Sequence, residues 1–306
     1  MYVISGPTAS GKTAVAIELA KKCGGEIISA DSMQVYKGMN IGTAKPSEAE
    51  TEGIPHYMID IINPDEQFSA AEFQTRAFDE IKKIRARGKI PIIAGGTGFY
   101  INAVLYGAVF SSNAKEEELR KYFEKLAQSN GAEFLHEKLR QVDPAYAATL
   151  HANNVKRVAR ALAYCEITCE KFSEYNAAQK IKRKNIFGAK NFILSMSRKI
   201  LYERINARTI AMFEAGLVEE VRDLLAKGYN KRLATMQGIG YKETVQFING
   251  EMSQAETVAA IQQATRHYAK RQETWFRNQM PEAIILSTEG KTPEELAEKI
   301  LHREDI

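Results

Sequence analysis

Gly6-Pro7-Thr8-Ala9-Ser10-Gly11-Lys12-Thr13 follows an apolar segment, Tyr2 to Ser5, and precedes a helical pattern from Thr13 to Lys22. It matches the P-loop pattern in full, in the strand–loop–helix setting that this motif requires. In such a loop, backbone N–H groups at a helix N-terminus surround phosphate oxygens, while the lysine and hydroxyl bind the distal phosphate and Mg²⁺. Nucleotide-binding and ATP-binding proteins share the loop, so the motif predicts a diphosphate or polyphosphate without identifying ATP.

The candidate phosphate ligands are therefore the loop residues, with Thr13 also the candidate Mg²⁺ ligand. They are Gly6, Thr8, Ala9, Ser10, Gly11, Lys12 and Thr13. Arg204 and Arg208 are four residues apart on one face of a predicted helix, so both could point at the same anion. We expect one of them to bind the diphosphate, although exposed salt bridges would explain the pair equally well.

Strand and helix patterns alternate over the first 110 residues. After the P-loop helix, strand-like runs occur at Glu26–Ala30, Tyr57–Ile62 and Ile90–Ala94, with a helix opened by a capping box at Ser69–Glu72 before the last of them. This order predicts an α/β fold, with a P-loop NTPase-like parallel sheet flanked by helices. Further strand patterns follow at Phe192–Leu194 and Ala283–Leu286, and a helical pattern runs from Leu201 to Lys227.

Between these strand patterns the periodicity is entirely helical. Amphipathic stretches cover Lys115–Arg140 and Val155–Glu170. We therefore predict a P-loop catalytic core formed by residues 1–110 plus 185–306, and an all-α insertion domain at 111–184.

Composition restricts the class of protein. The 306 residues are 26% charged and 44% hydrophobic, which is typical of a globular protein. No window approaches the roughly 18 uninterrupted apolar residues of a membrane span, and no secretory signal is recognisable. Three cysteines cannot make a disulfide framework. We expect a cytoplasmic monomer that does not associate with membranes.

The net charge is only +4, but the basic residues are concentrated. Residues 156–199 contain eleven Lys or Arg against three Glu, with the densest run at Lys180–Lys184. A second basic cluster, at Arg266–Arg277, is interleaved with Tyr268, Trp275 and Phe276. Cations bind phosphates and aromatic faces stack on unpaired bases, so this pattern suits a nucleic-acid surface. The charge pattern alone is equally typical of a solvated helix face.

Asp31 is the carboxylate that the sequence places at a strand end beside the phosphate loop. An Asp there could organise a metal or cap a helix. It could also act as a general base on an acceptor that lies opposite the leaving group.

Several further segments occur in a specific order along nearly the whole chain. They are Ser29-Ala-Asp-Ser-Met-Gln-Val-Tyr36, Met39-Asn-Ile-Gly-Thr-Ala-Lys-Pro46, Gly53-Ile-Pro-His56, Gly95-Gly-Thr-Gly-Phe-Tyr100, Lys156-Arg-Val-Ala-Arg-Ala-Leu162, Gly238-Ile-Gly-Tyr-Lys-Glu243 and Tyr268-Ala-Lys-Arg-Gln-Glu-Thr-Trp-Phe-Arg277. Together with the P-loop, this set closely resembles the tRNA dimethylallyltransferase (tRNA isopentenyltransferase) family. The resemblance implies transfer of a dimethylallyl group from dimethylallyl diphosphate to N6 of adenine 37 in the tRNA anticodon loop, with Mg²⁺ as cofactor.

The resemblance also implies roles for individual residues. Asp31 would be the catalytic base, and Thr97 would lie at the reacting centre. Gln34 has the donor–acceptor pair that can read an adenine edge. The residues expected to contact tRNA are Asp31, Ser32, Met33, Gln34, Thr97, Lys156, Arg157, Arg160, Gly238, Lys242 and Arg271.

Three other functions share part of this evidence. A P-loop kinase would transfer a phosphoryl group from ATP but would have a compact lid in place of a long basic insertion. A prenyltransferase acting on free adenine nucleotides would lack the basic helical domain. A non-catalytic RNA-binding protein would not need the intact Lys12, Thr13 and Asp31.

Overall fold

The computed structural model describes residues 1–108, 114–181 and 184–302. The chain forms two compact units, one of Met1–Ala108 with Asn185–Ile306 and one of Val109–Lys184. Within the described residues, no helix combines the length and the apolar character needed to cross a membrane.

The first unit is built on a six-stranded sheet in which all neighbouring strands are parallel. Its strands are β1 (Tyr2–Ser5), β2 (Gly25–Ser29), β3 (His56–Tyr57), β4 (Ile90–Gly95), β5 (Lys190–Ser195) and β6 (Ile284–Ser287), in the order β3-β2-β4-β1-β5-β6. The predicted α/β class with a parallel sheet is confirmed. β3 is shorter than the apolar run at 57–62, because Met58 and Asp60 adopt positive φ angles of 66° and 54° and leave the extended conformation.

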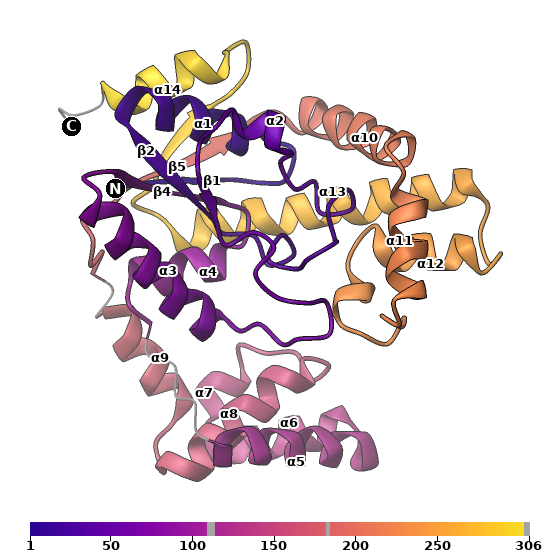
Figure 1. The fold of residues 1–306 in the computed structure, drawn as a ribbon. Helices are drawn as coiled ribbons and strands as arrows, with labels where there is room; N and C mark the ends of the chain where they lie inside the picture. The colour runs from indigo at the N-terminus through magenta and orange to yellow at the C-terminus, as the bar shows by residue number, and fades with distance from the viewer. Residues whose placement is uncertain (109–113, 182–183, 303–306) are drawn as a thin grey trace. The chain divides into compact units, whose positions relative to one another are not determined.

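Helices cover both faces of this sheet (Figure 1). Alternate residues of a strand point to opposite faces. In β1, Val3 therefore packs against α3 (Ala70–Ala86), α4 (Gly98–Leu105) and α13 (Gln254–Gln279). Tyr2 and Ile4 instead pack against α1 (Lys12–Cys23) and α14 (Pro293–Leu301). Burial on both faces explains why the strands read as short, nearly continuous apolar runs.

The predicted helix from Leu201 to Lys227 is two helices. α10 (Arg198–Glu214) and α11 (Leu217–Ala226) are separated at Gly216, whose φ of 98° belongs to the left-handed region that favours glycine. A separate apolar core joins α11 to α12 (Tyr241–Ile248) and to the segment after β2. The short helices α2 (Glu48–Thr51) and η1 (Thr235–Gln237) complete the elements of this unit.

All regular elements described in the second unit are helices. They are α5 (Ala114–Asn130), α6 (Ala132–Val142), α7 (Pro144–Ala147), α8 (Val155–Thr168) and α9 (Phe172–Ile181). α8 contributes a buried stripe, Val158, Leu162 and Cys165, to their common core. Its opposite face carries Lys156, Arg157 and Arg160, all exposed.

Candidate active site

The P-loop leaves β1 at the sheet edge where the carboxyl ends of the parallel strands meet. Gly6 has a φ of 146°, and a Cβ at this position would lie 2.7 Å from the carbonyl oxygen of Leu194. Only glycine therefore allows the loop to lie this close to β5. Ala9 and Gly11 also have positive φ angles, of 63° and 88°. Among the residues that the structure describes, none is a hydrogen-bond partner of the buried Ser10 hydroxyl.

A cavity of about 740 Å³ opens beside this loop. Its lining includes the predicted phosphate ligands Thr8, Ala9, Gly11, Lys12, Thr13, Arg204 and Arg208, together with Asp31 and Gln34. Gly6 and Ser10, the other predicted ligands in the loop, are not among the lining residues. The structure thus brings together residues from α1, α10 and the segment after β2 around one cavity, and their binding roles stay predictions.

Four cationic side chains line this cavity, those of Lys12, Lys45, Arg204 and Arg208. The Lys12 ammonium donates to the carbonyl oxygen of Pro7, at 2.7 Å. Desolvation by burial, opposed by the charge of Asp31 and reinforced by that of Arg208, lowers the pKa of Lys12 to about 7. Burial also lowers the pKa of Arg208, whose charge faces Asp31 and Glu50. A bound anion would therefore stabilise the charged forms of Lys12 and Arg208.

Asp31 lies just after β2 at the wall of the cavity, where its charge interacts with those of Lys12 and Arg208. Its Oδ1 accepts hydrogen bonds from the backbone N–H groups of Met33, at 2.8 Å, and Gln34, at 3.3 Å. This turn fixes the carboxyl group and leaves its other oxygen outside the turn. The carboxylate consequently has a defined orientation at the cavity wall.

Thr97 lies next to this turn, at the N-terminus of α4. Its hydroxyl oxygen accepts the Ser32 N–H at 3.0 Å, and its own N–H donates to the Ala30 carbonyl at 3.0 Å. The Tyr268 hydroxyl lies close to the Thr97 side chain. Burial, together with the charge of Asp31, raises the pKa of Tyr268 to about 12, so the phenol remains a neutral donor at physiological pH.

Gln272, one helical turn after Tyr268, forms hydrogen bonds to both glycine-rich loops, which are the P-loop and the loop at Gly95–Gly98. Its Oε1 accepts the Thr8 N–H at 2.8 Å, and its Nε2 donates to the Gly96 carbonyl at 2.8 Å. The Thr8 amide is therefore bonded inside the protein. Sequence reasoning missed both Gln272 and Tyr268 as site residues. One signal was available, because Gln272 is a polar residue spaced three and four positions from the buried Ala269 and Phe276.

We expect Gln272→Met to lower kcat/KM by roughly 10- to 100-fold and to destabilise the fold by about 1–3 kcal/mol. Methionine keeps the length of the side chain but leaves buried polar groups of both loops without partners. Steady-state kinetics and thermal unfolding measure the two effects. Gln263→Met, on an exposed position of the same helix, is the control. Kinetics like those of the unmodified chain would show that the loops hold their positions without Gln272.

The predicted acceptor-binding residues Met33 and Gln34 are partly engaged within the protein. The Gln34 Oε1 accepts from the Ser29 hydroxyl at 2.9 Å, and its Nε2 donates to the carbonyls of Thr43 and Ala44 at 3.3 and 3.1 Å. Met33 packs against Gly238, where an added Cβ would approach the Met33 Cε to 2.9 Å. Gln34 therefore supports the segment around Asp31, and reading of an adenine edge by its amide stays a prediction.

The remaining predicted tRNA contacts are exposed cations on helices. Lys242 lies at the start of α12, and the Arg271 guanidinium lies over the Tyr268 ring, 5.6 Å from its centroid. In the other unit, Lys156, Arg157 and Arg160 line the exposed face of α8. Lys182 and Arg183 of the basic run at 180–184 lie outside the described residues.

The aromatic residues of the second basic cluster do not form an exposed stacking surface. Phe276 is buried in the core beneath the sheet. Trp275 covers Gly98, where an added Cβ would lie 2.1 Å from its ring. Tyr268 lines the cavity. These side chains join α13 to the site, because helix periodicity turns them toward the sheet and leaves the cations on the other side.

Oxygen atoms at the cavity suit a hard divalent cation better than a soft one. The Thr13 side chain is exposed to the cavity that Asp31 also lines. Across the described ranges, no three His, Cys, Asp or Glu side chains cluster as a metal site would require. One hydroxyl with phosphate oxygens is, however, a ligand set that Mg²⁺ accepts, because it retains waters and bound phosphates.

Comparison with known proteins agrees with this geometry. The profile of the family described as IPP transferase matches residues 34–279. A tRNA dimethylallyltransferase of Acetivibrio thermocellus is 52% identical over 280 residues, which cover 90% of this chain and 88% of the relative. One from Caldanaerobacter subterraneus subsp. tengcongensis is 46% identical over 301 residues, or 98% and 96% of the two chains.

Two solved structures have the same fold. A crystal structure of tRNA delta(2)-isopentenylpyrophosphate transferase from Staphylococcus epidermidis is similar with a TM-score of 0.72 and 45% identity, over 99% of this chain and 97% of that one. A eukaryotic dimethylallyltransferase acting on tRNA gives a TM-score of 0.79 with 29% identity, over 94% of this chain and 73% of that one. The cavity, the P-loop and the carboxylate beside it thus occur in a chain that belongs to the IPP transferase family.

Proposed function

We propose that this protein transfers a dimethylallyl group from dimethylallyl diphosphate to N6 of adenine 37 in the tRNA anticodon loop, releasing diphosphate. The observation that carries the proposal is that Lys12, Arg208 and Asp31 line the same cavity and interact through their charges. The reacting centre then contains cations that can bind a diphosphate and a carboxylate that can take a proton from a nucleophile. Family membership supports the same reaction.

The leaving group is stabilised where its charge develops. The C1–O bond of an allylic diphosphate breaks readily because the allylic cation is delocalised. Lys12, Arg208 and the P-loop amides other than those of Thr8 and Ser10 face the departing oxygens and stabilise them as they become negative. Thr13 would hold Mg²⁺ together with diphosphate oxygens, and the ion supplies further positive charge when bound.

Asp31 acts on the nucleophile. The N6 amine of adenine is weakly nucleophilic because its lone pair is delocalised into the ring. As the bond from C1 to N6 forms, the free carboxylate oxygen of Asp31 takes the N6 proton. Thr97 and Tyr268 position the adenine beside Asp31, because the Thr97 hydroxyl accepts the Ser32 N–H and Tyr268 lies close to Thr97. The adenine must leave its stack to enter this site.

The direct test is product formation. The protein is incubated with dimethylallyl diphosphate, Mg²⁺ and either unmodified tRNA or AMP, and the nucleosides are analysed by mass spectrometry. We expect N6-dimethylallyladenosine at position 37 of tRNA. Prenylated AMP without modified tRNA would instead identify a transferase for free nucleotides. ATP turnover with a phosphorylated small molecule would identify a kinase.

The second unit is proposed to bind the anticodon stem-loop of the tRNA. Replacing Lys156, Arg157 and Arg160 by Gln should weaken tRNA binding and make log K less steep against log salt by roughly 0.7–0.9 per lost phosphate contact. Filter binding at several salt concentrations measures the slope. Arg140→Gln is the control, because Arg140 already pairs with Glu137 at 2.6 Å on the same unit. An unchanged slope for the triple variant would remove α8 from the tRNA interface.

A further inference from the structure

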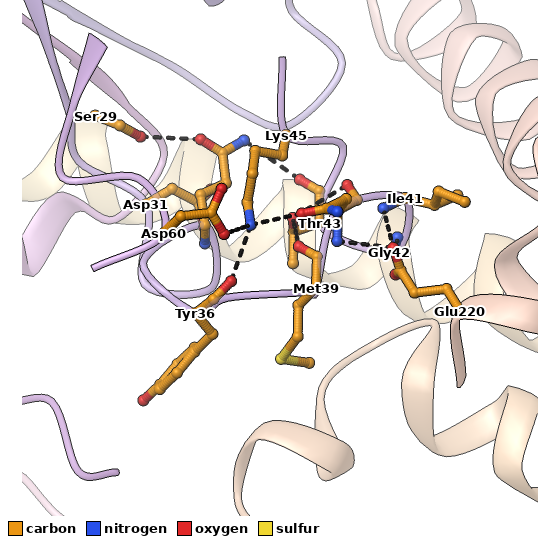
Figure 2. A network of polar contacts seen from close by, with 12 residues as sticks. Ser29, Asp31, Tyr36, Met39, Ile41, Gly42, Thr43, Lys45, Asp60 and Glu220 are labelled. Atoms are coloured by element: carbon orange, nitrogen blue, oxygen red, sulfur yellow. Dashed lines mark hydrogen bonds and ion pairs between the residues drawn. The ribbon is translucent and has the colours of Figure 1, made fainter. Parts of the chain in front are cut away.

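Glu220 of α11 binds three successive backbone N–H groups of a distant loop. Its Oε2 accepts from Asn40 at 2.8 Å and Ile41 at 2.7 Å, and its Oε1 accepts from Gly42 at 3.1 Å. Figure 2 shows this carboxylate facing the backbone of Ile41 and Gly42. The Tyr241 hydroxyl donates to Oε1 as well, at 2.8 Å. One carboxylate thus satisfies four donors, which uses the whole acceptor capacity of its two oxygens.

The anchored loop continues directly into residues that hold Gln34. The carbonyls of Thr43 and Ala44 accept the two hydrogen bonds of the Gln34 Nε2, and the Ser29 hydroxyl donates to its Oε1. The Gln34 N–H in turn donates to Asp31 Oδ1. A continuous chain of hydrogen bonds and short backbone segments therefore connects Glu220 to the carboxylate at the reacting centre.

Lys45 holds the C-terminal end of the same loop in place through hydrogen bonds and an ion pair. Its ammonium donates to the carbonyl of Tyr36 and the side-chain oxygen of Asn40, both at 2.9 Å, and forms an ion pair with Asp60. The Lys45 side chain is only 5% exposed. In Figure 2 this side chain points toward Tyr36 and Asp60. The loop is held at both ends by charge-assisted bonds, which are stronger than neutral ones.

Packing leaves the loop little freedom to shift. A Cβ at Gly42 would lie 2.5 Å from the Tyr241 ring, so the backbone rests directly on that ring. Tyr241 and Met39 are fully buried in the core that α11 and α12 share with this segment. Moving the loop would therefore expose apolar surface in addition to breaking the bonds to Glu220.

We propose that Glu220 is a positioning residue for the acceptor nucleobase. Its carboxylate fixes residues 40–42 and, through Gln34, the segment from Asp31 to Gln34 that faces the adenine. This role rests on the proposed function, since it assumes that the segment binds tRNA. Glu220 itself is absent from the cavity lining, so it does not contact the diphosphate.

Glu220→Gln tests the role with little change in volume. A glutamine has one carbonyl oxygen, and its NH₂ group would face N–H donors, so part of the loop loses its acceptor. We expect the KM for tRNA to rise about tenfold or more, about 1.4 kcal/mol per decade. The KM for dimethylallyl diphosphate should rise less than the KM for tRNA, because the P-loop and α10 are on other elements and only Thr43 to Pro46 of the anchored loop border the cavity. Glu219→Gln is the matched control, since Glu219 is exposed and pairs only loosely with Arg222, at 3.7 Å.

Hydrogen exchange reports on the loop independently of activity. In Glu220→Gln, amides of residues 34–46 should exchange faster, while those of residues 2–13 keep their wild-type rates. Tyr241→Phe removes one of the four donors and should cause a smaller change of the same kind. General destabilisation would instead accelerate exchange everywhere and leave both KM values unchanged.

The outcomes separate the two proposals. Unchanged exchange at residues 34–46 overturns the anchoring role, whatever the activity. Faster exchange with an unchanged KM for tRNA overturns the link between the loop and the acceptor. An unmodified chain that makes no prenylated tRNA overturns the proposed function, and the exchange experiment still decides whether Glu220 anchors the loop.

Discussion

Asp31→Asn should lower the rate of prenyl transfer by roughly 10²–10⁴-fold while dimethylallyl diphosphate still binds. An asparagine Oδ1 can accept the Met33 and Gln34 N–H groups that Asp31 Oδ1 accepts now. The turn is therefore kept, and the basic oxygen is lost. Single-turnover kinetics at saturating tRNA measures the rate, and calorimetric titration with the donor measures binding.

Asp65→Asn is the control for this substitution, because Asp65 is an exposed carboxylate of the same unit outside the cavity lining. Its single-turnover rate should match that of the unmodified chain. A near-normal rate for Asp31→Asn would exclude Asp31 as the base. Loss of donor binding in that variant would show that Asp31 acts chiefly by balancing Lys12 and Arg208.

Binding of the diphosphate should be coupled to uptake of a proton by Lys12. The pKa of Lys12 is about 7 in the free cavity, so at pH 8 most of the ammonium is deprotonated. A bound diphosphate favours the charged form and raises this pKa toward the ordinary value of about 10.4. Affinity should therefore fall as pH rises above about 7, by at most tenfold per unit, and be independent of Lys12 well below that pH.

Calorimetry in buffers of different ionisation enthalpy measures this uptake directly. At pH 8 we expect up to one proton taken up per donor bound, fading by about pH 6. Lys12→Met should abolish the uptake and lower kcat by roughly 10²–10³-fold, because a cation facing the leaving group is lost. Proton uptake that persists in Lys12→Met would assign the linkage to another group, such as the diphosphate itself.

Local sequence was sufficient wherever a feature depends on neighbours along the chain. The P-loop, the helix start at Ser69 and the second glycine-rich loop have short-range signatures, and each occurs in the structure where it was expected. Only half of the predicted capping box forms, because the Ser69 hydroxyl accepts the Glu72 N–H while the Glu72 carboxylate pairs with Arg76. Asp31 could be placed because carboxyl ends of parallel strands share one edge. The break at Gly216 was missed, since the apolar period continues across it and a single glycine does not by itself end a helix.

Hydrogen bonds between residues far apart in the sequence could not be predicted. Gln272 reaches Thr8 across 264 positions, and Glu220 reaches Ile41 across 179. Nothing in the local pattern around either residue specifies those contacts. The same holds for the saturated amide of Gln34, whose partners are set by the path of the loop.

Local patterns along the chain were therefore enough to predict a phosphate-binding loop, a carboxylate at the adjoining strand end, and basic helices. The side chains that hold these groups in position became known only from the folded chain. Backbone conformation and the periodicity of helices and strands depend on neighbouring residues, so the spacing of residue types along the chain predicts them. Buried hydrogen bonds between remote segments form only when packing brings the segments together, so their donors and acceptors are chosen by the fold.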